Sequence, residues 1–262
     1  MRAVAYADAG VRAVKTPKGE GSVRTYFGEV LKVHPGPQGF LVDWTNPGAR
    51  IDPHFHDIDQ FQVVVRGTGR IGKKRIEPIT FQYADGFTPY GPIVAEDEGI
   101  GFFTLRVAPS SGIWPMPGSR QFMPGRAGRN IAGIFRADRN PLPAGEARHE
   151  ILIAATADGM TVEGQSLGPN AKAVGRASDG GGQYCLVCSG ALRHQGKVLE
   201  QNALIWVDPG EAPPHFEAGP EGASVLILQF PRPTDRPGSD PDKLAARAAD
   251  NYSMPQGFVK PD

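Results

Sequence analysis

The sequence lacks the features that mark several large classes of protein. Only two of its 262 residues are cysteines, and a zinc knuckle would need a second pair. Lysine plus arginine equals aspartate plus glutamate at 28 each, and no long block of one charge occurs, which argues against a nucleic-acid partner. No apolar run reaches the roughly eighteen residues of a membrane span, and the N-terminus has no signal-peptide core. We therefore expect a cytoplasmic protein without a membrane partner, whose ligand is a small molecule.

The two cysteines, Cys185 and Cys188, have the spacing C-x-x-C within QYCLVCSG. On a strand, residues three apart point to opposite faces, so the pair cannot easily act together. We predict a buried, reduced and structural role for both. A redox role is the alternative.

Glycine and proline, by contrast, are abundant, with 34 and 25 residues. Short runs of alternating apolar residues, such as those at 40–44, 60–65 and 80–83, are separated by turns every eight to twelve residues or so. This pattern predicts an all-β sandwich or barrel. A segment rich in glycine and proline at 113–147 is expected to connect two domains. The tail at 233–262 is expected to be peripheral, with one short helix from Asp240 to Asn251.

An internal repeat indicates how the chain is organised. An offset of 123 residues aligns positions 60–106 with positions 183–229 without a gap. Identical or similar residues then coincide in the pairs Gln60 and Gln183, Gly67 and Gly190, Tyr83 and Trp206, Asp85 and Asp208, Gly99 and Gly222, and Leu105 and Leu228. The repeat predicts two copies of one β-unit in tandem.

The stretch GARIDPHFHDIDQFQVVVRG, from Gly48 to Gly67, carries the clearest chemistry. It places His54 and His56 two residues apart, so both imidazoles leave the same face of an extended chain and can meet one metal ion. Gln60 follows and begins a predicted strand. Period-two alternation puts Gln60, Gln62 and Val64 on one face of that strand.

This pattern, Gly-x5-His-x-His-x3-Gln-x6-Gly, closely resembles the first motif of the cupin superfamily, with Gln60 in place of the family's usual glutamate. Together with the repeat, the resemblance implies a bicupin. It would have two tandem antiparallel β-barrels of the jelly-roll (double-stranded β-helix) type, at 1–112 and 148–232. It also implies that His54, His56 and Gln60 bind one divalent metal ion (Fe, Zn, Ni or Mn), and that Gln60 and Gln62 face a polar substrate pocket.

The second cupin motif is incomplete. Pro89-Tyr90-Gly91 matches the motif's Pro-x-Gly, but Val94 stands in place of the histidine ligand. Tyr90 and Glu96 are candidate catalytic residues near the same mouth of the barrel. The alternatives are a packing tyrosine and a solvated acid.

The second copy of the repeat lacks the histidine pair. The same offset puts Ala177 and Asp179 in place of His54 and His56, so we expect a single site, in the N-terminal barrel. His215 and Glu217 lie in a proline-rich stretch and are expected to be exposed turn residues.

Three functions are compatible with these patterns. The first is a metal-dependent enzyme (oxygenase, lyase or isomerase) acting on a small organic molecule. The second is a non-catalytic small-molecule binding or sensory bicupin without metal, and the third is a storage or structural protein. In a metal-free pocket, His54 or His56 would act as a general base or hydrogen-bond donor, and a purely structural role is also open. We expect a homodimer, because the exposed edge strands of such barrels are often covered by a partner chain.

Overall fold

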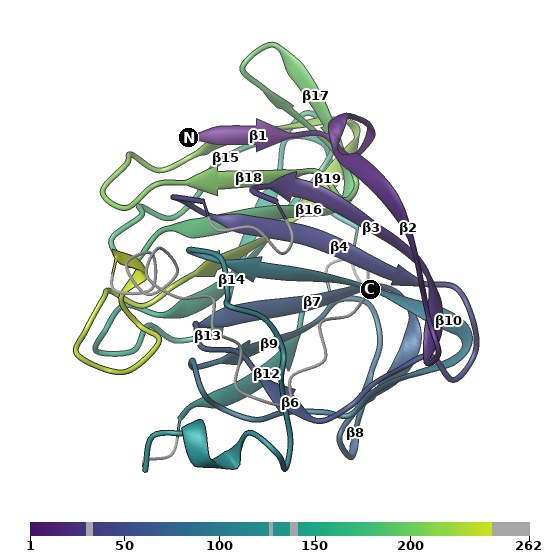
Figure 1. The fold of residues 1–262 in the computed structure, drawn as a ribbon. Helices are drawn as coiled ribbons and strands as arrows, with labels where there is room; N and C mark the ends of the chain where they lie inside the picture. Colours follow the sequence, from purple (N-terminus) through teal and green to yellow (C-terminus); the bar gives the residue numbers. More distant parts are fainter. Residues whose placement is uncertain (30–33, 126–127, 137–140, 243–262) are drawn as a thin grey trace. The chain divides into compact units, whose positions relative to one another are not determined.

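The protein is almost entirely β-structure. A computed structural model describes residues 1–29, 34–125, 128–136 and 141–242 (Figure 1). Within these ranges there are two single-turn 3-10 helices, η1 (Tyr6–Asp8) and η2 (Arg120–Phe122), and residues 241–242 are α-helical. None of these has the length or the apolar character that crossing a bilayer requires. The predicted helix at Asp240–Asn251 lies, from residue 243 onward, outside the described residues.

The first large sheet has nine strands, and β10 pairs antiparallel with β4, β5 and β7, as do β3 with β4 and β7 with β8. Its central order is β12-β9-β7-β10-β4-β3-β2, with β5 beside β10 and β8 beside β7. The bounds are β2 (Gly10–Thr16), β3 (Gly19–Phe27), β4 (Gln38–Trp44), β5 (Arg50–Ile51), β7 (Gln60–Ile71), β8 (Lys74–Ile76), β9 (Thr80–Ala84), β10 (Ile93–Arg106) and β12 (Asn130–Ile134). A separate two-stranded sheet pairs β6 (His54–Phe55) with β11 (Trp114–Pro115). We call this part the N-terminal barrel.

The second large sheet has eight strands in the order β1-β18-β16-β19-β14-β13, with β15 beside β19 and β17 beside β16. Its strands are β1 (Arg2–Val4), β13 (Ala147–Ile153), β14 (Thr161–Leu167), β15 (Lys172–Val174), β16 (Gln183–His194), β17 (Lys197–Glu200), β18 (Leu204–Val207) and β19 (His215–Gln229). We call this part the C-terminal barrel. The all-β architecture of two antiparallel barrels predicted from the sequence is confirmed.

The chain divides into two compact units, whose boundaries differ from the predicted domain boundaries at both ends of the chain. One unit combines Met1–Gly10 and Ile79–Phe81 with Gly133–Arg232, and the other contains Val11–Pro78, Gln82–Ala132 and residues 233–242. The N-terminal strand β1 pairs with β18, so the start of the chain completes the sheet of the C-terminal barrel. Backbone hydrogen bonding between Asp59 and Gly238 likewise ties the tail to the N-terminal barrel.

The internal repeat corresponds to one sheet geometry used twice. Gln60 faces Arg106 where β7 pairs with β10, and Gln183 faces Gln229 where β16 pairs with β19. Each pairing has an irregularity at the equivalent place, next to Arg66 in the first copy and next to Ser189 in the second. The repeat therefore includes the bulges as well as the strands.

Glycines fix the bend after these bulges. Gly67 and Gly190 have φ values of 68° and 65°, in the left-handed region that side chains with a Cβ disfavour. A Cβ at Gly67 would lie 2.2 Å from the carbonyl oxygen of Gly99, and one at Gly190 would lie 2.1 Å from that of Gly222. The same close approach of backbones therefore requires glycine in both copies.

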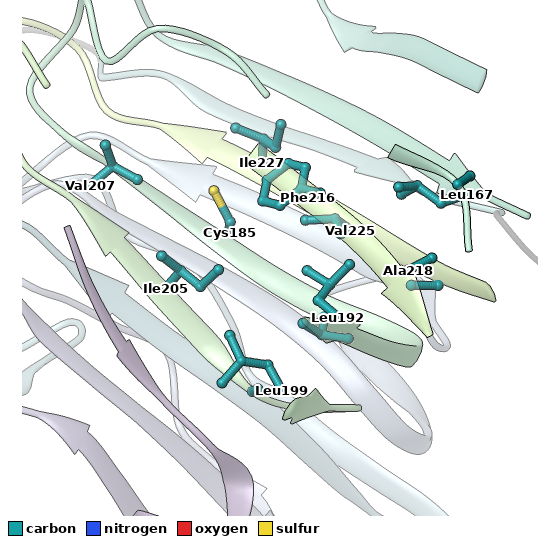
Figure 2. Close-up of a cluster of buried hydrophobic side chains, with 14 residues drawn as sticks. Leu167, Cys185, Leu192, Leu199, Ile205, Val207, Phe216, Ala218, Val225 and Ile227 are labelled. Carbon is teal, nitrogen blue, oxygen red and sulfur yellow. The ribbon is translucent and has the colours of Figure 1, made fainter. Parts of the chain in front are cut away.

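The C-terminal barrel has an apolar core, beside which Glu163, Gln183 and Gln229 are buried polar side chains. Its core consists of aliphatic side chains with Phe216 and Cys185, which point toward one another from β14, β16, β18 and β19 (Figure 2). Cys185 belongs to this core, whereas Cys188, which is also buried and forms no disulfide, does not. Burial raises the pKa of the Cys185 thiol, which opposes formation of a thiolate.

The N-terminal barrel has a mixed interior. An apolar cluster that includes Val42, Val64 and Phe102 fills one part of it. The remainder is polar, because buried side chains on the same strand faces belong to Gln38, Gln60, Gln62, Gln82, Thr104 and Arg106. This polar part adjoins the histidine pair.

Candidate active site in the N-terminal barrel

The histidine pair is held between two neighbouring segments. The backbone N–H and C=O groups of His54 bond those of Tyr90 at 3.1 and 3.0 Å, and β6 pairs with β11 on its other side. The two imidazole rings lie edge to face, with their centroids 5.1 Å apart. The two histidine side chains therefore lie next to each other, as their spacing in the sequence predicts.

Phe55, between the two histidines, anchors this segment. Its ring stacks on Trp114 with centroids 5.7 Å apart and an interplanar angle of 16°, and Phe122 packs edge to face on Trp114. The glycine- and proline-rich segment expected to be a connector thus contributes a strand and two aromatic side chains to the support of the histidine pair.

The tautomer of His54 follows from its partners. Its Nδ1 lies 2.6 Å from the backbone carbonyl of Asp52, and a carbonyl oxygen can only accept, so Nδ1 carries the proton. Nε2 is then the basic nitrogen, and it accepts a hydrogen bond from the Tyr90 hydroxyl at 2.9 Å.

His56 has the same arrangement with different partners. Its Nδ1 donates to the carbonyl of Gly112 at 2.6 Å, with Ser110 Oγ at 3.1 Å. Ser110 Oγ in turn donates to Asp57 Oδ1 at 2.8 Å, which fixes the serine against the imidazole. Both histidines therefore present Nε2 as the unprotonated nitrogen.

Burial keeps the two imidazoles neutral. Desolvation is the main cause that lowers the pKa of His54 to about 4, and the positive charge of Arg106 adds to this effect. Desolvation, followed by the charges of Arg106 and His54, also lowers the pKa of His56. Neutral imidazoles with a free Nε2 lone pair are the form that binds metal ions or accepts protons.

A directional chain of hydrogen bonds leads from Arg106 to His54. Arg106 can only donate, and it does so from Nε and Nη2 to Gln60 Oε1 at 3.2 and 3.1 Å. The amide nitrogen of Gln60 donates to the Tyr90 oxygen, and the Tyr90 hydroxyl donates to His54 Nε2. The chain ends at the carbonyl of Asp52, so every donor and acceptor along it is determined.

These hydrogen bonds determine what Gln60 can do. Its carbonyl oxygen, the atom that would bind a metal ion, already accepts two hydrogen bonds from Arg106. The atom that it turns toward Tyr90 is a donor. As arranged here, Gln60 positions Tyr90 and does not present a metal ligand, which differs from the expectation based on the cupin motif.

Tyr90 keeps its proton at neutral pH. Burial raises the pKa of Tyr90 to about 12, although Arg106 and the hydrogen bond from Gln60 act in the opposite direction. Its ring packs edge to face on His54 with centroids 4.6 Å apart. Tyr90 is therefore placed to donate a hydrogen bond or a proton beside the histidine pair.

Two further amides near the polar interior have unused hydrogen-bonding capacity. Gln62 Oε1 and Gln82 Nε2 are buried and have no hydrogen-bond partner among the described residues. Buried amides without partners are rare, because losing hydrogen bonds to water costs free energy. They indicate a region that favours a polar ligand or water.

Glu96 does not join this group. Ile93 and Ala95 belong to the core cluster, so by strand alternation Val94 and Glu96 face away from the interior. Glu96 accepts a hydrogen bond from Thr68 Oγ1 at 2.7 Å and lies 3.7 and 3.9 Å from Arg75 and Arg70. The sequence spacing that links Glu96 to Val94 is correct, but their shared face is the outer one.

The segment between His56 and Gln60 is anchored by a second polar cluster. The buried Asp59 forms an ion pair with Arg236 from the tail and accepts a hydrogen bond from the Tyr83 hydroxyl at 2.8 Å. The Tyr83 oxygen also lies 2.9 Å from Asp85 Oδ1, and Asp85 pairs with Arg129 at 3.0 Å. Burial raises the pKa of Asp59 despite the opposing effect of Arg236.

Among the described residues, the C-terminal barrel has no counterpart of the histidine pair. Its strand pairings show that the offset changes just before residue 60, because Val94 faces Arg50 whereas Glu217 faces Lys172. The counterparts of the histidines are therefore Ala177 and Asp179 or, with this one-residue gap, Arg176 and Ser178. Neither alignment supplies a histidine. His215 and Glu217 belong to β19, not to the expected turn, although His215 is exposed.

No family model and no curated protein matches this sequence, whereas solved structures match over most of the chain. A candidate dioxygenase from Nostoc punctiforme superposes with a TM-score of 0.61 at 11% identity, over 91% of this chain and 84% of that chain. An oxalate decarboxylase from Lactobacillus farciminis in complex with formate gives 0.57 at 12% identity, over 87% and 86%. A quercetin 2,3-dioxygenase from Acinetobacter baumannii gives 0.51 at 12%, over 84% and 77%.

These similarities establish the fold. The chain has the double β-barrel fold of these structures, which is the fold that the resemblance to cupins implies. The sequence-based assignment of the cupin fold is confirmed. At these identities the comparisons do not transfer a reaction or a substrate to this chain.

Proposed function

We propose that the N-terminal barrel is the active site of a cupin-type enzyme, which acts on a small organic molecule and uses one divalent metal ion held by His54 and His56. One observation carries this proposal. Both imidazoles donate their Nδ1 proton to backbone carbonyls, which leaves both Nε2 atoms basic. Metal-binding histidines are oriented by such an acceptor on their other nitrogen.

The donor set fits an open metal site better than a closed one. Among the described residues, no group of three His, Cys, Asp or Glu side chains is close enough to hold an ion. The Gln60 oxygen is engaged by Arg106. The protein would thus contribute the two imidazoles, and water or substrate oxygens would occupy the remaining positions. A bound ion would act as a Lewis acid on a substrate oxygen.

The surrounding residues have separate roles in this proposal. Tyr90, protonated at neutral pH, donates a hydrogen bond or a proton to the reacting molecule. Arg106 supplies a buried positive charge that stabilises negative charge developing on the substrate. Gln60 is a positioning residue, because it connects Arg106 to Tyr90. These roles suit an oxygenase, lyase or isomerase, and the similar structures include dioxygenases and a decarboxylase.

Metal analysis of the purified protein tests the proposal directly. Plasma mass spectrometry is expected to find about one equivalent of Fe, Zn, Ni or Mn per chain. His54→Ala and His56→Ala should each remove it, since two nitrogen donors are the minimum that this site offers. His215→Ala, an exposed histidine of the other barrel, is the matched control and should retain the metal. Protein that neither carries nor takes up a transition metal would contradict the metal-dependent function.

The second candidate is a metal-free binding site for a small molecule. Two observations favour it. The Tyr90 hydroxyl donates a hydrogen bond to His54 Nε2, the atom that would bind a metal ion, and the positive charge of Arg106 disfavours a cation nearby. Tyr90→Phe separates the two candidates. In the metal-dependent enzyme it should leave metal content unchanged and lower turnover by roughly a hundredfold, the usual contribution of a positioned proton donor. In a metal-free site it should weaken ligand binding, and the recovered ligand should be chemically unaltered.

A further inference from the structure

The C-terminal barrel contains a cavity that the proposed function does not use. Its volume is about 570 Å³, within the range of sites that take small organic ligands. It lies where β15, the end of β16 and the start of β19 meet. Side chains that define its chemistry are those of Lys172, Val174, Arg193, His194, Phe216 and Glu217.

His194 is the most informative of these residues. Its side chain is only 8% exposed, and its Nε2 has no hydrogen-bond partner among the described residues. Burial, followed by the charge of the N-terminal amine, lowers the pKa of His194, so the ring is neutral at pH 7. A buried imidazole nitrogen without a partner in a cavity wall is suited to bond a polar atom of a ligand.

The charged groups of the cavity give it an excess of positive charge. Lys172 Nζ lies 3.4 Å from Glu217 Oε2, and Arg193 Nη1 lies 3.3 Å from Glu217 Oε1. Two cations thus share one carboxylate. A second carboxylate, from a ligand, would balance them.

Another part of the lining is apolar, although Gln195 and His215 also border the cavity. Phe216 is almost fully buried, and Val174 is 54% exposed although it is a large hydrophobic residue. Pro213 and Ala173 extend the same wall. This surface can pack against the hydrocarbon or aromatic part of a ligand.

The cavity is not a remnant of the histidine-pair site. None of the counterparts of His54 and His56 lines it. In the N-terminal barrel, the positions of His194 and Glu217 are occupied by Ile71 and Val94. The polar lining is therefore specific to the C-terminal barrel.

We propose that this cavity is a second ligand site, which binds a small organic monocarboxylate with an apolar body. The carboxylate lies between Lys172 and Arg193 and accepts a hydrogen bond from the Nε2–H tautomer of His194. The apolar body packs on Phe216 and Val174. The site is independent of any metal at His54 and His56.

Calorimetric titration of the full chain with benzoate tests the proposal, with benzamide as the uncharged molecule of the same shape. Benzoate should bind with a Kd of about 1 mM or tighter, and about tenfold more tightly than benzamide. His194→Leu should weaken benzoate binding about tenfold and Lys172→Gln severalfold. Lys197→Gln, which removes a positive charge of the same barrel outside the cavity, is the matched control and should change binding less than about twofold.

Several results would overturn the proposal. Equal binding of benzoate and benzamide would show that the carboxylate is not recognised. Equal losses of benzoate affinity in Lys172→Gln and Lys197→Gln would show that only the overall charge of the barrel matters. Binding lost in a His54→Ala, His56→Ala double variant but retained in His194→Leu would assign benzoate to the N-terminal barrel. Lys172 is largely exposed, so Lys172→Gln gives a valid answer even if His194→Leu fails to fold.

Discussion

The two barrels share a frame and differ in what fills it. The pairing of β7 with β10 and that of β16 with β19 have the same registers and bulges. At equivalent inward positions, however, the N-terminal barrel has Gln62, Gln82, Thr104 and Arg106, where the C-terminal barrel has Cys185, Ile205, Ile227 and Gln229. The comparison teaches that strand register in this fold depends on backbone and turn geometry, so the interior is free to be either a core or a polar site.

Both barrels have a glutamine as the first residue of the equivalent strands β7 and β16. Gln60 bonds Arg106 and Tyr90, and Gln183 donates to the backbone carbonyl of Arg176 at 2.8 Å. Both are buried. The shared glutamine therefore has a role in the barrel wall, and only the first copy uses it to orient a functional side chain.

The largest difference between the barrels should appear on truncation of one equivalent pair. Ile205→Ala should lower the free energy of unfolding by about 4 kcal/mol, because it opens a cavity in an apolar core. Gln82→Ala, at the equivalent position, should cost less than about 1 kcal/mol, because the amide nitrogen that it removes has no partner among the described residues. Urea denaturation measures both. Equal costs would show that the two interiors are packed alike.

Acid should destabilise the N-terminal barrel of the metal-free protein through its histidines. The pKa of His54 is about 4 in the folded protein, below its ordinary value of 6.5, so the unfolded chain binds more protons between these values. The stabilisation present above pH 6.5 is lost as the pH falls toward 4, and His54 alone accounts for about 3 kcal/mol of it. Hydrogen exchange followed by mass spectrometry can assign the loss to one barrel.

The matched control for this pH dependence is a double variant, His54→Gln, His56→Gln. Its N-terminal barrel should show a much weaker dependence on pH over the same interval. An unchanged dependence would mean that other groups of the N-terminal barrel are responsible.

Exchanging a core residue between the barrels should have a smaller effect. Cys185→Gln places an amide in the apolar core without a partner, which should cost about 2 kcal/mol of unfolding free energy. The reverse exchange, Gln62→Cys, removes an amide oxygen that has no partner among the described residues and should be nearly neutral. If Gln62→Cys were the more destabilising change, then Gln62 would be part of a satisfied network.

Much of the frame was predictable from the sequence because it is encoded locally. Alternation and turn residues define the strands, and the repeat aligns Gly67 with Gly190 without any knowledge of the structure. The position of the histidine pair also follows from its two-residue spacing. These features depend on neighbours in the chain.

The parts that could not be predicted depend on pairings between distant segments. Arg106 reaches Gln60 only through the antiparallel register of β7 and β10, and the sole clue in the sequence was its alignment with Gln229. Ser110 supports His56 from a segment that resembles a linker. Glu96 was misplaced because spacing along a strand determines which residues share a face, but not which face is buried.

The pairing of β1 with β18 has a consequence for how the protein can be divided. Strand β1 completes a sheet whose other strands lie more than a hundred residues later in the sequence, so that sheet closes only through a long-range pairing. The tail that carries Arg236 returns in the same way to the N-terminal barrel. A gene cut between the barrels would therefore yield two fragments that each lack an end segment of their own unit.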